Sequence, residues 1–241
     1  MRIIIEKDYQ DIGKTANKFM RELLINNPNA TLGLATGSSP VGLYKEMIAD
    51  NKAGITTFKN IKTVNLDEYV GLPEGHDQTY RYFMNDNLFN HIDIDKNNTR
   101  VPNGMAENLE NACKEYTDYV AKNIPDVQIL GIGSNGHIAF NEPGTPFDAH
   151  THIVTLKEGT RQDNARFFSS IDEVPTHAIT MGIADIMQAK MIILVANGIG
   201  KSKAIYDMAK GPITTDCPAS ILQSHPNVIV IVDESAGYLL K

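Results

Sequence analysis

The sequence predicts an α/β protein with one mostly parallel sheet and helices on both faces of that sheet. Short apolar runs alternate with longer segments in which apolar residues recur at helical spacing. Strands that alternate with helices in this way form parallel βαβ units. No internal repeat, low-complexity tract or evident linker divides the chain, so we expect a single catalytic domain over residues 1–241.

The first half of the chain supplies three expected strands, each followed by an expected helix. Asp8 is the expected N-cap of the first helix, which ends before the break at 26–29. Pro40 is expected at the first position of the second helix, behind a serine cap. The expected strands are 3–5, 31–35 and 61–66. The expected helices begin after residue 8 and at Pro40, and two of them, 79–90 and 106–123, follow the third strand.

The second half repeats the pattern with one exception. The expected strands are 127–132, 151–156, 178–181, 191–196 and 228–232, with helices at 160–168 and 182–187. After the strand at 127–132, a polar loop occupies the place where a helix should begin. That loop, 131–144, is the most informative stretch of the sequence.

The 131–144 loop carries three glycines within six residues and then proton-transfer groups. Ligands of open α/β sheets bind at the carboxyl ends of strands, where this loop lies. His137, with Asn135 and Glu142 nearby in sequence, forms a candidate general acid/base cluster. Two other interpretations are a histidine that only makes structural hydrogen bonds and a dinucleotide-binding loop. The dinucleotide fingerprint belongs to an early βαβ unit, whereas this loop lies past mid-chain.

Two further loops suit an anion. Thr36, Gly37, Ser38 and Ser39 follow an expected strand and precede a helix, so amides, hydroxyls and the helix dipole can face one phosphate. The 197–203 loop places lysines behind glycines at a similar junction. An ordinary capped turn and solvent-facing lysines are the alternatives.

An acidic pair, Asp67 and Glu68, ends the expected strand at 61–66. One of them can serve as a general base, with the other solvated or structural; a helix or turn cap is the alternative. All these loops fall on the same edge of the predicted sheet, which favours one shared site. We therefore expect the site to perform acid/base chemistry on a phosphorylated metabolite. No metal-ligand spacing stands out, so we expect neither a metal nor a cofactor.

Composition excludes several classes of protein. The chain has 241 residues and a net charge of −7, without a basic stripe for nucleic acid. Its two cysteines, Cys113 and Cys217, form no disulfide framework or metal spacing. No signal peptide and no apolar run of membrane-spanning length is evident, so we expect a cytoplasmic protein without membrane or nucleic-acid partners.

These motifs together resemble the glucosamine-6-phosphate deaminase (isomerase) family. The segments that carry the resemblance are 34–40, 65–72, 131–143 and 166–175. The similarity spans nearly the whole chain. It implies a Rossmann-like fold shared with ribose-5-phosphate isomerase and 6-phosphogluconolactonase. It also implies conversion of glucosamine 6-phosphate and water to fructose 6-phosphate and ammonia, in amino-sugar catabolism.

The resemblance implies a role for each site residue. Asp67 matches the base that moves a proton between C2 and C1, and His137 matches the group that opens the pyranose ring. Asn135 and Glu142 match the partners that orient His137. The matching phosphate-binding positions are Thr36, Gly37, Ser38, Ser39, Arg166 and Lys201, with Lys203 as an alternative to Lys201.

The chain departs from the larger family members in two respects. They carry aspartate where this chain has Asn135, so Glu142 alone would supply the negative charge beside His137. They also have a C-terminal extension and a basic pair on the strand at 152–154, which this chain lacks. We therefore expect the shorter, non-allosteric branch, as a monomer or small homo-oligomer. A 6-phosphogluconolactonase and a non-catalytic sugar-phosphate sensor are the alternatives; the first needs no base at Asp67, and the second would lose its proton-transfer groups.

Overall fold

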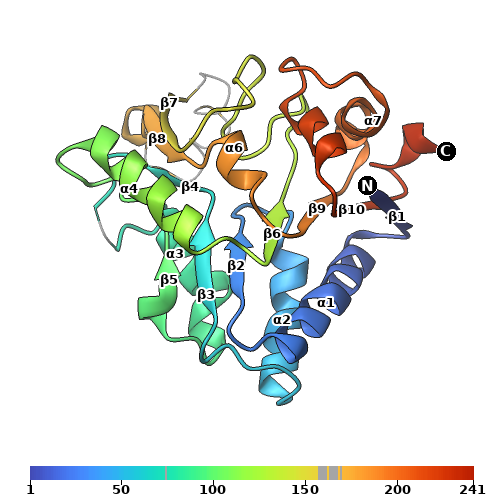
Figure 1. The fold of residues 1–241 in the computed structure, drawn as a ribbon, viewed down its shortest axis with the longest axis horizontal. Coiled ribbons are helices and arrows are strands. Elements are labelled where there is room, and N and C mark those ends of the chain that lie inside the picture. The colour runs from blue at the N-terminus through green and yellow to red at the C-terminus, as the bar shows by residue number, and fades with distance from the viewer. Residues whose placement is uncertain (74, 157–161, 163–167, 169) are drawn as a thin grey trace.

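The computed structural model describes residues 1–73, 75–156, 162, 168 and 170–241, and Figure 1 shows their arrangement. A seven-stranded sheet forms the centre, in the order β1-β10-β9-β6-β2-β3-β5. Every neighbouring pair in it is parallel, which confirms the predicted fold class. The strands are β1 (Arg2–Glu6), β2 (Thr31–Leu34), β3 (Lys62–Asn65), β5 (Thr99–Arg100), β6 (Val127–Leu130), β9 (Ile192–Ala196) and β10 (Val228–Asp233).

Helices cover both faces of this sheet. They are α1 (Tyr9–Asn26), α2 (Val41–Lys52), α3 (Tyr80–Asn87), α4 (Leu109–Lys122), α6 (Ile183–Ile186) and α7 (Ser202–Lys210). The crossovers through α1 and α2 run toward the β5 edge, and those through α4 and α7 run toward the β1 edge. Because parallel crossovers are right-handed, α1 and α2 lie on one face and α4 and α7 on the other. Helices α1 and α2 accordingly pack side by side (Figure 1).

A second, antiparallel sheet was not expected from the sequence. It has the order β4-β8-β7, with β4 (Asp67–Tyr69), β8 (His177–Thr180) and β7 (His152–Thr155). The chain leaves the central sheet at Leu66, whose carbonyl accepts a hydrogen bond from the Met181 amide at 2.7 Å. This switch carries Asp67 beyond the carboxyl edge of the central sheet. In Figure 1 the small sheet lies beside α4 at the upper left.

Most predicted elements are present, with shifted ends. The short strand β5 was missed, and the helix expected at 79–90 ends at Asn87 and gives way to a 3₁₀ turn, Phe89–His91. The helix expected at 160–168 lies almost wholly outside the described residues. Among the described residues, no helix is long and apolar enough to cross a membrane.

The predicted serine cap of α2 is wrong. Pro40 is itself the N-cap, and its side chain makes no capping hydrogen bond. The Tyr9 hydroxyl caps one free amide of the first turn instead. It accepts a hydrogen bond from the Gly42 amide at 2.8 Å and donates one to the Ser38 carbonyl at 2.7 Å. The Ser38 and Ser39 hydroxyls therefore do not cap α2 and are available to contact a ligand.

Candidate active site

A cleft of about 800 Å³ opens at the carboxyl edge of the central sheet. It collects residues from several segments that are far apart in the sequence, and the predicted site residues in it come from four of them. The predicted site residues that line it are Thr36, Gly37, Ser38, Ser39, Asp67, His137 and Lys201. The expectation that these loops share one edge of the sheet is therefore met by the geometry. Asn135 and Glu142 are not part of the lining and lie behind His137.

Asp67 is a buried carboxylate at the base of the cleft, with 8% of its surface exposed. Its Oδ1 accepts a hydrogen bond from the Thr180 hydroxyl at 2.5 Å. Burial raises the pKa of Asp67 to about 7, although hydrogen bonds from Thr180 and the Phe140 amide act in the opposite direction. A carboxylate that titrates near neutral pH is suited to accept and return a proton.

Glu68 faces away from this chemistry and holds α3 in place. Its carboxylate accepts hydrogen bonds from the Tyr69 and Tyr80 amides at 2.9 Å and from the Arg81 amide at 3.0 Å. The Tyr80 and Arg81 amides are the first two of α3, so Glu68 of β4 caps the N-terminus of this helix. Of the acidic pair, Asp67 is the candidate base and Glu68 is structural, and buried rather than solvated.

His137 is oriented by the two residues that the sequence placed beside it. Its Nδ1 lies 3.2 Å from Oε1 of Glu142, and Oε2 of Glu142 accepts a hydrogen bond from the Asn135 amide at 2.8 Å. The side-chain oxygen of Asn135, Oδ1, accepts a hydrogen bond from the His137 backbone N–H at 3.2 Å. The carboxylate beside the imidazole is therefore that of Glu142, and Asn135 fixes its direction.

Gly133 makes room for the imidazole. A Cβ atom at this position would lie 2.3 Å from the His137 ring. The loop closes on itself through a hydrogen bond of 2.9 Å from the Gly133 amide to the His137 carbonyl. The glycine thus serves a close approach of ring to backbone, and not a pyrophosphate as in the dinucleotide interpretation.

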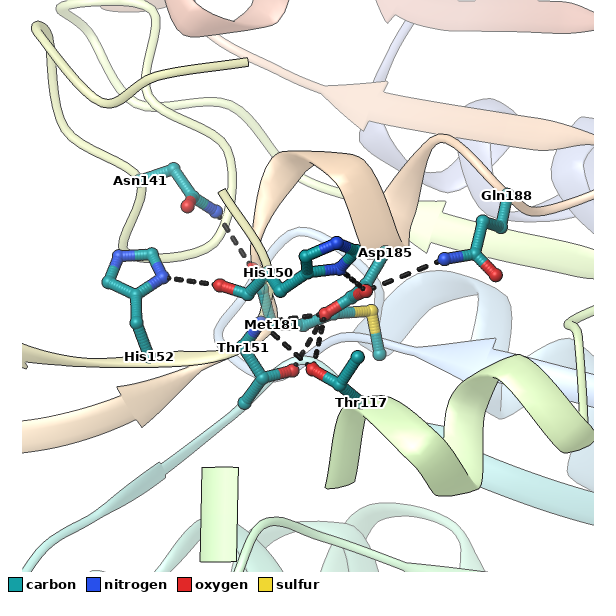
Figure 2. Close-up of polar contacts among 8 residues, drawn as sticks. All are labelled: Thr117, Asn141, His150, Thr151, His152, Met181, Asp185 and Gln188. Carbon is teal, nitrogen blue, oxygen red and sulfur yellow. Dashed lines mark hydrogen bonds and ion pairs between the residues drawn. The ribbon is translucent and has the colours of Figure 1, made fainter. Parts of the chain in front are cut away.

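The far side of the loop is anchored by Asn141, which is fully buried. Its amide donates to the carbonyls of Ile138 at 3.0 Å and Met181 at 2.9 Å. Figure 2 shows Asn141 reaching the Met181 carbonyl beside a second cluster centred on Asp185. There Asp185 binds the Thr151 amide at 2.7 Å and His150 Nδ1 at 2.6 Å. These contacts hold the segment after the loop against α6, and sequence reasoning missed them.

The opposite end of the cleft suits an anion. The backbone N–H groups of Gly37, Ser38 and Ser39 make no hydrogen bond within the described part of the chain. Gly37 has a φ of +83°, which a residue with a side chain rarely adopts, and it turns the chain just before α2. Together with the start of α2, these amides form a site for a negative charge.

Lys201 lies in this cleft, whereas Lys203 does not. Burial lowers the pKa of Lys201, as expected for a cation that pairs with no carboxylate among the described residues. Lys203 pairs with Asp207 on the surface of α7, which raises its pKa. The geometry therefore favours Lys201 over Lys203 as an anion ligand. Arg166, the other cationic candidate, lies outside the described residues.

An aromatic wall lines the cleft near Asp67. Tyr80 and Phe140 stack with their ring centroids 6.2 Å apart, and Tyr69 lies 4.8 Å from Tyr80. These rings come from β4, α3 and the 131–144 loop. Their ring faces make this side of the cleft less polar around the buried Asp67.

Proton-transfer groups at the carboxyl edge of a parallel sheet define this protein as an α/β enzyme. It belongs to the glucosamine-6-phosphate isomerase/6-phosphogluconolactonase family, whose model matches residues 7–230. A glucosamine-6-phosphate deaminase of Clostridium perfringens is 54% identical, and one of Lactobacillus delbrueckii subsp. bulgaricus is 52% identical; both comparisons cover each chain completely.

Solved structures agree with this family. A monomeric glucosamine-6-phosphate deaminase superposes with a TM-score of 0.95 at 43% identity, covering 99% of this chain and 100% of the other. A 6-phosphogluconolactonase from Trypanosoma cruzi has a TM-score of 0.79 at 17% identity, covering 100% and 97%. The second likeness shows the fold alone.

Proposed function

We propose that this enzyme converts glucosamine 6-phosphate and water into fructose 6-phosphate and ammonia, in amino-sugar catabolism. The observation that carries the proposal is that Asp67, His137 and Lys201 line one cleft. The names of the similar proteins support the same reaction. The site draws on residues from 36 to 201, so we propose one catalytic domain within residues 1–241.

The reaction begins with the closed sugar ring. His137 takes the proton of the C1 hydroxyl and returns a proton to the ring oxygen, which opens the pyranose to the aldehyde. Imidazole suits this exchange because it accepts and donates protons near neutral pH. Nδ1 faces Glu142 at 3.2 Å, which assigns the exchange to Nε2. The Glu142 carboxylate stabilises the imidazolium between the two transfers.

Asp67 then acts on the open chain. Its carboxylate removes the C2 proton to give an enolamine and delivers that proton to C1. The C1 oxygen gains a proton and the nitrogen loses one, which leaves a C1 hydroxyl and an imine at C2. Water adds to the imine carbon, and ammonia leaves as the ketone forms. A base with a pKa of about 7, raised by burial, is half ionised at neutral pH and can both take and give up the proton.

The phosphate holds the other end of the substrate. We propose that Thr36, Gly37, Ser38, Ser39 and Lys201 bind it, together with Arg166 on the basis of sequence. Binding energy from this remote group positions C1 and C2 against Asp67 and His137.

The direct test is ammonia release from glucosamine 6-phosphate by the purified enzyme in the presence of a chelator. We expect turnover, because each step uses only side chains of this chain. A parallel assay with 6-phosphogluconolactone should show no hydrolysis above the spontaneous rate. Lactone hydrolysis without ammonia release would overturn the proposal in favour of the lactonase alternative.

The two lysines of the 197–203 loop provide a prediction about phosphate binding. Lys201→Met should raise KM about 10- to 100-fold, since a charge-assisted contact to a phosphate is lost. Lys203→Met should leave KM within about twofold, because an exposed ion pair with Asp207 contributes little. Steady-state kinetics and inhibition by inorganic phosphate measure both. Equal KM values for the two variants would contradict the assignment.

We also propose that the enzyme works as a monomer or small homo-oligomer without allosteric activation. A similar protein of known structure is monomeric. Substrate saturation should then be hyperbolic and unchanged by N-acetylglucosamine 6-phosphate, with the mass measured by light scattering in the same buffer. Sigmoidal kinetics that the acetylated sugar relieves would contradict this proposal.

A further inference from the structure

Thr180 connects the candidate base, Asp67, with the loop that carries His137. It ends β8, directly opposite Asp67 in the antiparallel ladder with β4, and it is fully buried. Its hydroxyl donates to Asp67 Oδ1 at 2.5 Å and accepts at 3.1 Å from the Phe140 amide, which also favours the Asp67 carboxylate. Phe140 belongs to the loop that carries His137, so one hydroxyl links the base to the ring-opening loop.

The direction of these two hydrogen bonds is fixed by chemistry. A backbone N–H can only donate, so the Thr180 oxygen must accept from Phe140. The single hydroxyl proton is then available to Asp67 Oδ1. If Oδ1 itself carried a proton, two donors would face one another across 2.5 Å, and the Thr180 proton would need another acceptor in a fully buried place.

The backbone next to Phe140 adopts an unusual conformation that accompanies the hydrogen bond to Thr180. Ala139 has a φ of +54°, the left-handed region that residues other than glycine seldom adopt. Ala139 lines the cleft, as His137 and Phe140 do. Strain of this kind persists where the surrounding structure requires it, and here it accompanies a Phe140 amide directed at Thr180.

We propose that Thr180 is a positioning residue that reserves Oδ1 of Asp67 as a hydrogen-bond acceptor, so that the substrate proton travels on Oδ2. The inference rests on the proposed function, because it assigns the oxygen that moves the proton from C2 to C1. One oxygen then removes and returns the proton on the same face of the substrate, without rotation of the carboxylate.

The Thr180 hydroxyl also favours the ionised form of Asp67, which provides a measurable signature. Other ionisable groups surround Asp67 and remain unchanged in the test. Among the described residues, these groups are Glu68 and Tyr69 of β4, Tyr80 of α3, Tyr116 of α4, His137 of the loop and Lys201 of the same cleft.

The test compares Thr180→Val, which keeps the shape and removes the hydroxyl, with Thr180→Ser, which keeps the hydroxyl. In Thr180→Val the acid limb of the kcat/KM profile should move up by about one pH unit, and kcat at pH 7 should fall about tenfold, with KM within about twofold. Thr180→Ser should keep the profile of the unchanged enzyme. Thr63→Val is the matched control, because the Thr63 hydroxyl is buried and has no partner within the described residues.

An unchanged profile in Thr180→Val overturns the inference, and so does a shift in Thr180→Ser as large as that in Thr180→Val. If circular dichroism shows that the valine variant does not fold, Thr180→Ala supplies the second variant without a hydroxyl. Its comparison with Thr180→Ser then tests the inference. Failure of the proposed function looks different. In that case the unchanged enzyme releases no ammonia from glucosamine 6-phosphate, whatever residue stands at position 180.

Discussion

Replacement of Asp67 with asparagine is expected to lower kcat about 10²- to 10⁴-fold, the range for loss of a general base. An amide cannot take the C2 proton, so exchange of that proton with solvent should be lost as well. The shape of the site should survive, because the asparagine carbonyl can still accept the hydrogen bond from Thr180. Ammonia release and deuterium incorporation at C2 measure the two effects.

The same substitution is expected to stabilise the protein above pH 7. Burial raises the pKa of Asp67 from 3.8 to about 7, so between these values the folded protein binds more protons than the unfolded chain. Stability therefore falls as pH rises through this window, by at most about 4 kcal/mol at the conversion of 1.36 kcal/mol per pH unit. Asparagine has no charge to bury and avoids this cost.

Thermal unfolding of both proteins from pH 4 to pH 9 tests the sign. The melting temperatures should agree near pH 4 and separate by several degrees in favour of Asp67→Asn above pH 7. Asp50→Asn is a matched control of opposite sign: burial raises the pKa of Asp50, but the Arg21 guanidinium and the Asn17 amide outweigh it and leave that pKa lowered. That variant should be less stable above pH 4. An Asp67→Asn variant with full turnover, or with no gain in stability at pH 8, contradicts the assignment.

The sequence was most informative where the chain passes from strand to loop. The strands that end in the 36–39, 131–144 and 197–203 loops are mainly apolar, and polar groups follow each of them within a few residues. Parallel strands share one carboxyl edge, so local patterns were enough to predict that these loops meet. The preference for Lys201 needed the structure, because both lysines follow the same glycines and differ only in the direction of their side chains.

The antiparallel sheet could not be predicted in this way. Its strand β4 is only Asp67–Tyr69, and it follows β3 after the single residue Leu66, so both strands read as one run. Thr180 was missed for the same reason. It looks like an ordinary β-branched strand residue, and its contact with Asp67 joins positions 113 residues apart. Pairing partners at that separation leave no local signal in a single sequence.

Replacement of His137 with glutamine is expected to lower turnover of the closed-ring substrate about 10²- to 10⁴-fold while the site stays intact. Glutamine fills similar space and hydrogen-bonds, but it cannot carry a proton from the C1 hydroxyl to the ring oxygen. It should fit where the imidazole lies against Gly133, since a flexible side chain is less demanding than a ring. The loss should therefore appear in kcat far more than in KM.

An acyclic ligand separates ring opening from binding. The C1-reduced form of glucosamine 6-phosphate cannot close its ring, so it needs no help from His137 to fit the cleft. Its affinity for His137→Gln, measured by calorimetry, should remain within about twofold of that for the unchanged enzyme. Equal losses for the acyclic ligand and for turnover would mean that His137 only shapes the cleft.

Glu142→Gln is the companion variant that tests how the imidazolium is stabilised. A glutamine at position 142 can still accept the hydrogen bond from the Asn135 amide, so the loop geometry is retained while the charge 3.2 Å from Nδ1 is removed. Because the partner of that carboxylate is an asparagine rather than a second acid, no other charge in this cluster replaces it. We expect a loss of kcat smaller than that of His137→Gln, as for a group that stabilises an intermediate charge without transferring the proton. Full activity in Glu142→Gln would show that ring opening proceeds without a charged imidazolium, and His137 would then act as a neutral donor.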